Sequence, residues 1–269
     1  MIIDGHAHAA GDYATAAAIS LAASKFDLAK IVLCTSPKNH QDLGKPPNLP
    51  FMKSPNSIYF LNNMVRLGYR SLKDNGDGNR YVRGLAEAQP RLVVQFLWVN
   101  PLDQRHLETL EQNILAYNVK GLKLHQAWDS FAIDSEPFLR VTEAATSHHL
   151  PIFIHLHSKR ETAKLAKFAV QTRDVVFIIA HMLGLGVFAE YATRLETLFF
   201  DTSGSERIRK QDILQAVNTF GYDHVVFGSD TPYASLADQI PKIQQLGVSP
   251  NVLDHIFFKN MAALLGNVP

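Results

Sequence analysis

Two histidines separated by one residue lie near the start of the chain, in the segment Ile2–His8. The segment begins with an apolar run that is typical of a β-strand. Side chains two positions apart on a strand point to the same side, so His6 and His8 can direct two imidazoles to one point. Imidazole nitrogens are common ligands of zinc and related divalent metals. The pair therefore suggests a metal site, although a surface His-x-His pair would have the same pattern.

Three more strand-like runs end in a possible metal ligand. They are residues 152–155, which end in a histidine, residues 176–181, which also end in a histidine, and residues 225–230, which end in an aspartate. A catalytic metal site takes three or four nitrogen or oxygen ligands and leaves one position open. Imidazole and carboxylate suit Zn, Mn, Fe or Co, and the lone cysteine, Cys34, excludes a closed site built from thiolates.

The segments that must position these residues alternate between strand-like and helix-like patterns. Apolar residues at helical spacing lie within residues 107–115 and 213–220, and Ser-Pro signals precede helices near residues 138 and 251. Eight runs rich in Val, Ile, Leu and Phe predict strands at residues 1–6, 30–35, 92–99, 119–125, 151–155, 175–181, 197–201 and 224–227.

These strand-like runs are almost continuously apolar, which is typical of parallel strands covered on both faces. Eight β/α units in about 250 residues match the size of a (β/α)8 barrel. The barrel also gathers the C-terminal ends of all its strands around one mouth, where distant residues can meet. We therefore predict an α/β chain that folds as one TIM barrel domain over residues 1–269, with a doubly wound open sheet as the alternative.

Residues 37–80 interrupt the alternation. This segment holds five of the 13 prolines, no clear strand, and seven Lys or Arg residues against three Asp, and it predicts a helix over residues 57–73. An insertion after the second strand lies at the catalytic face of a barrel, where loops form lids and substrate walls. We expect a lid-like insertion suited to an acidic substrate. A solvated basic face is the simpler alternative for any single residue in it.

The net charge and the lengths of the apolar stretches limit the kinds of partner that the protein can be expected to bind. The chain of 269 residues has a net charge of +1, which gives no reason to expect nucleic acid as a partner. No apolar stretch approaches the roughly 20 residues that span a bilayer, and no signal-peptide pattern is present. We expect a cytoplasmic protein that acts on a small molecule without a membrane partner, with a buried Cys34 thiol. A homodimer is the default oligomer.

Taken together, these motifs resemble the amidohydrolase superfamily, and more narrowly its amidohydrolase-related branch ("amidohydrolase 2") of metal-dependent TIM barrel hydrolases and decarboxylases. The resemblance covers nearly the whole chain except residues 37–80, and it depends on the order and spacing of the motifs. The matching segments are residues 4–8, 121–125, 154–155, 180–181, 227–232 and 255–263.

The resemblance implies one divalent metal rather than two, most often zinc, with manganese or iron as alternatives. It implies four metal ligands: His6, His8, His155 and Asp230. It also makes Asp230 and His181 catalytic. Asp230 takes a proton from water at the metal and later donates it to the leaving group. His181 orients the water or substrate, or holds a second metal in two-metal members.

Lys123 and His125 are the expected substrate-binding residues. In some branches a lysine at the end of the fourth strand is carbamylated and bridges two metals. The Lys-Leu-His form found here favours an unmodified Lys123 that contacts the substrate or the Asp230 carboxylate. His125 is a candidate substrate contact, with a structural role as the alternative.

Further polar residues are expected at the same mouth. Asp4 is a candidate for orienting a metal ligand. His157 and residues 201–203 are candidates for substrate contact, and Arg207 and Arg209 for meeting an anionic group. A solvent-facing or structural role is the alternative for each of them.

The chemistry predicted from the sequence is hydrolysis of a C–N or C–O bond, as in an amide or lactone, of a small acidic molecule. One alternative is metal-dependent nonoxidative decarboxylation of an aromatic or unsaturated acid, which would use the same ligands. Hydrolysis is preferred because 269 residues is short for such decarboxylases. A non-catalytic metal-binding barrel is the alternative of another class, and it is disfavoured because every expected ligand position holds a competent residue.

Overall fold

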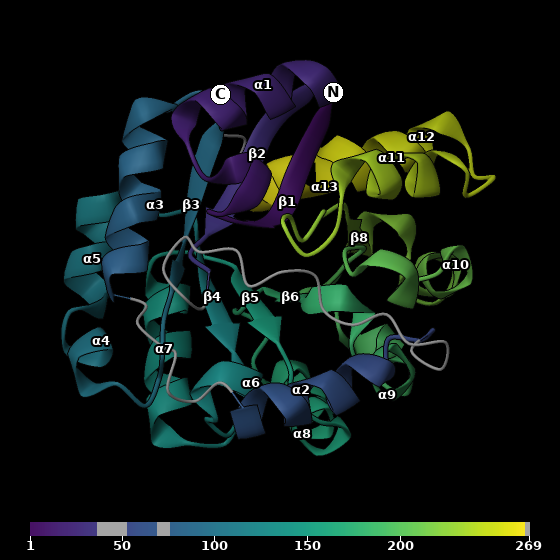
Figure 1. Ribbon diagram of the computed structural model, residues 1–269. Coiled ribbons are helices and arrows are strands. Elements are labelled where there is room, and N and C mark those ends of the chain that lie inside the picture. Colours follow the sequence, from purple (N-terminus) through teal and green to yellow (C-terminus); the bar gives the residue numbers. More distant parts are fainter. Residues whose placement is uncertain (37–52, 69–75, 267–269) are drawn as a thin grey trace.

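The computed structural model describes residues 1–36, 53–68 and 76–266 (Figure 1). Eight parallel strands form one sheet in which each strand pairs with the next along the chain, and helices lie between them. The predicted (β/α)8 TIM barrel is confirmed. The strands are β1 Ile2–His8, β2 Leu28–Cys34, β3 Val93–Trp98, β4 Gly121–His125, β5 Ile152–His155, β6 Phe177–Ile179, β7 Leu198–Asp201 and β8 Val225–Val226.

The helices pack around the outside of this ring, as Figure 1 shows. Among the described residues, none of them has both the length and the apolar character needed to cross a membrane. The helices are α1 Ala16–Phe26, α2 Ser57–Gly68, α3 Gly76–Ala88, α4 Gln104–Glu108, α5 Leu110–Tyr117, α6 Gln126–Asp129, α7 Glu136–Ser147, α8 Lys159–Gln171, α9 Leu185–Ala189, α10 Lys210–Phe220, α11 Leu236–Gln244, α12 Pro250–Asp254 and α13 Asn260–Leu264.

The barrel closes where the chain that follows β8 meets β1. The amide of Gly5 donates to the carbonyl of Phe227 at 2.9 Å, and the amide of Asp230 donates to the carbonyl of His6 at 2.8 Å. Ala7 forms a parallel bridge with Thr231. The first and last strands are thereby joined beside the residues that were expected to hold the metal.

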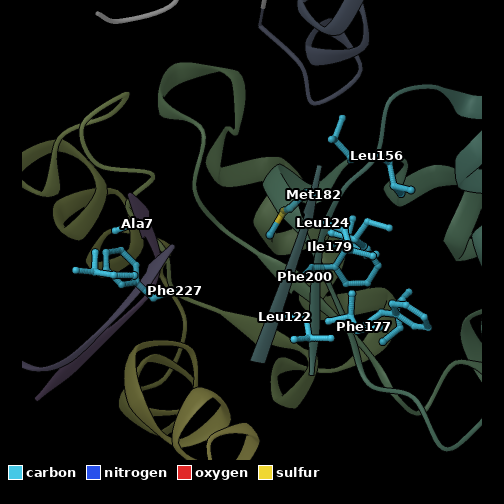
Figure 2. Close-up of a cluster of buried hydrophobic side chains, with 14 of the residues drawn as sticks. Ala7, Leu122, Leu124, Leu156, Phe177, Ile179, Met182, Phe200 and Phe227 are labelled. Carbon is cyan, nitrogen blue, oxygen red and sulfur yellow. The ribbon is translucent and has the colours of Figure 1, made fainter. Parts of the chain in front are cut away.

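Two buried layers explain why the strands are apolar without alternation. Inside the ring, Ile3, Phe96 and Phe153 pack with Met261 and Leu265 from the C-terminal helix. Outside the ring, alternate strand residues pack against the helices, and Figure 2 shows part of this layer with side chains from β4, β6 and β7. Both faces of each strand are covered, as expected for parallel strands.

Helix signals in the sequence were correct in most places. Ser249 caps α12 by accepting from the amide of Val252, and Ser135 directly precedes α7. Leu115 was expected to face the core with Ile114, but its side chain is 70% exposed. Leu107, Leu110 and Ile114 stay on one buried face across the break at Thr109, whereas the side chain of Leu115, one residue after Ile114, points about 100° away from that of Ile114.

The insertion contributes α2, which confirms a helix within residues 57–73. Residues 37–52 and 69–75 of the predicted insertion lie outside the described residues. The next helix, α3, begins at Gly76 and packs against β2 and β3, so it is the regular barrel helix between these strands. Figure 1 shows α2 lying across the C-terminal ends of β4 and β5, next to α6.

Candidate metal centre

His6 and His8 lie side by side on β1, with ring centres 5.4 Å apart, and both are buried. Each ring is held through Nδ1. His6 Nδ1 lies 3.0 Å from Ser203 Oγ and 3.2 Å from Asp201 Oδ2, while His8 Nδ1 donates to the carbonyl of Thr35 at 2.8 Å. Metal-binding histidines are held in this way, because the bond at one ring nitrogen directs the other toward the ion.

The Nε2 atoms of both rings face Asp230, which follows β8. Its Oδ1 lies 3.8 Å from His6 Nε2 and 3.5 Å from His8 Nε2. Asp230 has a left-handed backbone with φ of 60°, and its amide bond to His6 fixes this turn against β1. Burial raises the pKa of Asp230, but His181, His8 and His6 outweigh burial and lower it to about 2. The carboxylate is therefore ionised at neutral pH.

The donor set fits a divalent metal. One ligand atom each from His6, His8 and Asp230 lies within 4.8 Å of the others, and these are two imidazoles and one ionised carboxylate. Burial lowers the pKa of His6 well below its usual value, so this imidazole is neutral. Burial also lowers the pKa of His8, but the Cys34 thiol and the Asp230 carboxylate outweigh burial and raise it to about 10. A metal at His8 would thus displace a proton.

His181 lies just beyond β6, which ends two residues earlier than expected. The strand stops at Ile179 because His181 has a left-handed backbone, with φ of 54°, in the short 3-10 turn Ala180–Met182. Its ring centre is 5.3 Å from that of His6, and its Nδ1 lies 2.9 Å from Ser203 Oγ. The structure therefore brings His181 to the edge of the donor set.

Asp201 and Ser203 at the end of β7 hold both of these rings. Ser203 Oγ donates its one proton to Asp201, so the Nδ1–H groups of His6 and His181 donate to this pair. Asp201 also accepts from the amide of His181 at 3.2 Å. The sequence placed residues 201–203 at the mouth as substrate contacts, but these contacts orient two histidines.

Asp4 acts on two of the expected metal ligands through the backbone, and its Oδ1 accepts from the amide of His6 at 3.4 Å. Its buried carboxylate accepts from Tyr13 at 3.0 Å and from the amide and hydroxyl of Ser229 at 2.8 and 2.6 Å. Asp4 lies two positions before His6 in the seam between β1 and the segment after β8. It holds this seam together and so fixes the turn that carries Asp230.

Lys123 projects into the barrel from β4 and is buried. Its Nζ lies 3.0 Å from His6 Nε2 and 4.1 Å from the centre of the Phe153 ring. Burial lowers the pKa of Lys123, while Cys34, Asp230 and Asp201 oppose this change. The structure thus places Lys123 against a histidine of the donor set. Cys34 is buried, as predicted, and its Sγ lies 3.4 Å from His8 Nδ1.

His125 and His155 stack on each other, with ring centres 3.9 Å apart, and Trp98 stacks on the other side of His125 at 5.5 Å. His155 Nε2 lies 2.9 Å from Asn62 Oδ1, an atom of α2. His155 is 5.0 Å from His181 between ring centres, but its Nε2 is not part of the set formed by the other three expected ligands. Sequence reasoning missed Asn62 because nothing in its neighbourhood indicates where α2 docks.

Two arginines that follow β7 have different surroundings. Arg207 is buried, and burial lowers its pKa while Asp230 and Glu206 oppose this change. Arg209 instead pairs with Asp212 at 2.9 Å at the start of α10, which is the structural alternative considered for it.

Comparison with known proteins gives one family match and several fold matches. A sequence model described as Amidohydrolase matches residues 3–266 of the chain. A search of curated proteins found no match to the chain.

The fold matches include enzymes of two reaction types. A dihydroxybenzoic acid decarboxylase from Polaromonas sp. JS666, with bound manganese and the inhibitor 2-nitroresorcinol, is 13% identical, with a TM-score of 0.69 over 100% of this chain and 98% of that chain. A probable 2-pyrone-4,6-dicarboxylic acid hydrolase from Acinetobacter baumannii, with citric acid bound, is 15% identical, with a TM-score of 0.69 over 98% and 99%. The 5-carboxyvanillate decarboxylase from Sphingomonas paucimobilis is 13% identical, with a TM-score of 0.63 over 91% and 82%. These identities show a shared fold alone.

Proposed function

Because the chain belongs to the Amidohydrolase family, whose model spans residues 3–266, we propose that it is a metal-dependent hydrolase acting on a small acidic molecule at the barrel mouth. One observation carries the proposal. The Nε2 atoms of His6 and His8 converge on the Asp230 carboxylate, while Nδ1 of each ring is held by a partner. Such preorientation is what a metal-binding pair of histidines needs.

His6, His8 and Asp230 would hold the ion. His155 is the expected fourth ligand, and it completes the set only if its Nε2 exchanges Asn62 for the metal. A divalent metal bound there polarises a carbonyl oxygen and lowers the pKa of water. We propose zinc, with manganese supported by the bound manganese of a fold neighbour.

Asp230 and His181 carry the proton transfers in this proposal. The ionised Asp230 carboxylate takes a proton from the attacking water and returns it to the leaving nitrogen or oxygen. His181 donates from Nδ1 to Ser203, so its Nε2 lone pair is available to orient that water or the substrate. Lys123, buried beside His6, and His125 are proposed to contact the substrate.

Nonoxidative decarboxylation remains the second candidate, and two observations support it. Several fold neighbours are decarboxylases. The preference for hydrolysis on grounds of length also fails, because the decarboxylase from Polaromonas is covered over 98% of its own length by this chain. In that reaction Asp230, ionised at neutral pH, would first take a proton from water or from a substrate hydroxyl and would then transfer it to the carbon that loses carbon dioxide.

Elemental analysis tests the metal proposal first. Protein purified without chelating resin should contain about one equivalent of a divalent metal, and the double variant His6→Ala, His8→Ala should contain none. A double variant His148→Ala, His149→Asn removes two histidines far from the site and should keep its metal. The proposal is wrong if metal content is equal in all three proteins, or if none binds even after reconstitution.

The two reactions differ in their products. Metal-loaded protein would be incubated with lactones, amides and hydroxylated aromatic acids. Release of acid without carbon dioxide supports hydrolysis, whereas release of carbon dioxide with loss of the carboxylate supports decarboxylation. Loss of either activity in the His6→Ala, His8→Ala protein would assign it to this site.

A further inference from the structure

Helix α2 is fixed over the end of β5 by buried polar contacts. The Asn62 side chain, 3% exposed, donates from Nδ2 to the carbonyl of Leu156 at 2.9 Å and accepts at Oδ1 from His155 Nε2 at 2.9 Å. On the same helix, Tyr59 Oη lies 2.6 Å from Thr162 Oγ1 of α8. Residues that follow on α2 are therefore held in place at the barrel mouth.

Arg66 lies one helical turn beyond Asn62, on the same face of α2. Its Nη1 lies 3.2 and 2.9 Å from the two ring nitrogens of His157, so the guanidinium sits against the imidazole. Asn63 Oδ1 lies 3.1 Å from His157 Nε2 on the adjacent side. Because Asn63 Oδ1 can only accept, His157 Nε2 donates to it and His157 Nδ1 is left to accept from Arg66.

Arg66 faces a histidine, whereas two other arginines of the described residues pair with carboxylates. Arg83 pairs with Glu87 at 2.7 Å, and Arg209 pairs with Asp212 at 2.9 Å. Within residues 1–36, 53–68 and 76–266, no carboxylate lies within 4.0 Å of the Arg66 guanidinium. Toward the described part of the chain, the hydrogen-bond contacts of this guanidinium are those of Nη1 with the His157 ring, and a guanidinium carries five N–H donors.

This arginine also lies on the same side of the barrel as the donor set. His157 follows His155 by two residues, and the His155 ring is 5.0 Å from that of His181. Contacts run from His6 to His181, from His181 to His155 and from His155 to Asn62. Asn62 then contacts the carbonyl of His157, whose ring contacts Arg66. A molecule bound at the donor set would reach Arg66 if it followed this line of contacts.

We propose that Arg66 and His157 form a carboxylate subsite at the rim of the mouth, which binds an acidic group of the substrate remote from the reacting one. The guanidinium fork matches the two oxygens of a carboxylate, and α2 holds it at a fixed distance from the donor set. The inference rests on the proposed function, because it requires that one substrate molecule contacts both Arg66 and the metal. The substrate class it names is a dicarboxylate.

The test compares binding of simple acids by calorimetry. Metal-loaded protein would be titrated with unbranched dicarboxylates from malonate to suberate and with monocarboxylates of the same carbon number. Wild type should bind at least one dicarboxylate ten times or more tightly than its monocarboxylate. Arg66→Met should lose this difference, Arg66→Lys should keep part of it, and Arg160→Met, an exposed arginine of α8, should keep all of it.

Thermal melting of each variant would confirm that it is folded. A dicarboxylate preference that is absent at every chain length, or that survives in Arg66→Met, overturns the subsite. The same titrations on metal-free protein separate this inference from the proposed function. If wild type binds no metal but its affinity for dicarboxylates still falls in Arg66→Met, the metal chemistry is wrong and the subsite stands. If wild type binds metal but Arg66→Met does not change the affinity for dicarboxylates, the subsite is wrong and the metal site stands.

Discussion

Individual hydrogen bonds decide which nitrogen of each histidine is available. Ser203 Oγ lies 3.0 Å from His6 Nδ1 and 2.9 Å from His181 Nδ1, so one hydroxyl sets the tautomer of both rings. His8 Nδ1 donates to a backbone carbonyl, and no side-chain substitution removes this acceptor. The donor set thus depends on residues that never touch the ion.

Replacing Ser203 should therefore weaken metal binding without removing a ligand. We expect Ser203→Ala to lower the affinity for zinc or manganese by about tenfold to a hundredfold, because His6 and His181 lose the group that fixes their rings. Competition with a chromophoric chelator measures this affinity. Ser235→Ala, which removes a hydroxyl from the distant N-cap of α11, should leave the affinity unchanged. Equal affinity in the two variants would contradict the role given to Ser203.

Lys242 gives stability a dependence on pH. Its Nζ donates to the carbonyls of Ser205 and Ile208 at 3.0 and 3.1 Å, and burial lowers its pKa from 10.5 to about 8, against the opposing effect of Asp201, Asp212 and Asp238. Between pH 8 and 10.5 the unfolded chain therefore holds the proton that the folded chain has lost. The free energy of unfolding should rise with pH across this window.

The contribution of Lys242 is on the order of 2 kcal/mol, and it is absent below pH 8, where both states are protonated. Denaturant unfolding of wild type and Lys242→Met at pH 7, 8, 9 and 10 isolates it, because all other titrating groups are common to both proteins. The stability difference should shift in favour of wild type as pH rises. A difference that is constant with pH would show that Lys242 has an ordinary pKa.

At the scale of elements, the strands could be predicted and the docking of α2 could not. Continuous apolar runs located all eight strands, because burial of both faces leaves a strong and local pattern. The contact of Asn62 with His155 joins residues 93 positions apart, and its formation depends on how the insertion folds over the mouth. The break at Thr109 was missed for a similar reason, since the periodicity on its two sides looks continuous.

Asn62 should contribute more to stability than an exposed amide. We expect Asn62→Leu to lower the free energy of unfolding by about 1–3 kcal/mol, because the carbonyl of Leu156 and the Nε2–H of His155 are left buried without a partner. Gln112→Leu makes the same chemical change at an exposed position of α5. Urea unfolding compares the two, and equal losses would mean that α2 is not held through Asn62.

Two glycines should respond in opposite directions to alanine. In β4, a Cβ on Gly121 would lie 2.4 Å from the Phe96 ring, so Gly121→Ala forces the inner layer apart and should cost about 1–3 kcal/mol. In α3, a Cβ on Gly84 meets nothing within 4 Å, so Gly84→Ala should stabilise the protein by about 0.5–1 kcal/mol. Chemical denaturation measures both. Destabilisation of similar size in the two variants would contradict this packing.

For the whole molecule, the donor set joins the two ends of the barrel. His6 and His8 belong to β1, and Asp230 belongs to the segment after β8, which pairs with β1 through backbone hydrogen bonds. A bound ion therefore adds a link across the seam where the ring closes. The family match covers residues 3–266, a range that includes all eight strands except the first residue of β1.

Metal binding should raise the stability of the entire fold. At a free metal concentration of a hundred times Kd, the expected gain is about 2.7 kcal/mol, because the ion binds the closed barrel and not the unfolded chain. Scanning calorimetry with and without chelator measures the shift in Tm. The His6→Ala, His8→Ala protein should show no shift. A metal effect of equal size in that variant would place the ion elsewhere on the molecule.

The contact between β1 and the segment after β8 also determines when, during synthesis of the chain, the metal site can form. The hydrogen bond between Asp4 and Ser229 spans 225 residues, so a ribosome adding about 5–20 residues per second needs roughly 10–45 s to supply its second partner after the first. During that interval the nascent chain carries two imidazoles and no closing carboxylate. A product that stops short of Asp230 has neither the third ligand nor the last turn of the ring. If the proposed function is correct, only chains whose synthesis has passed the eighth strand can retain the ion.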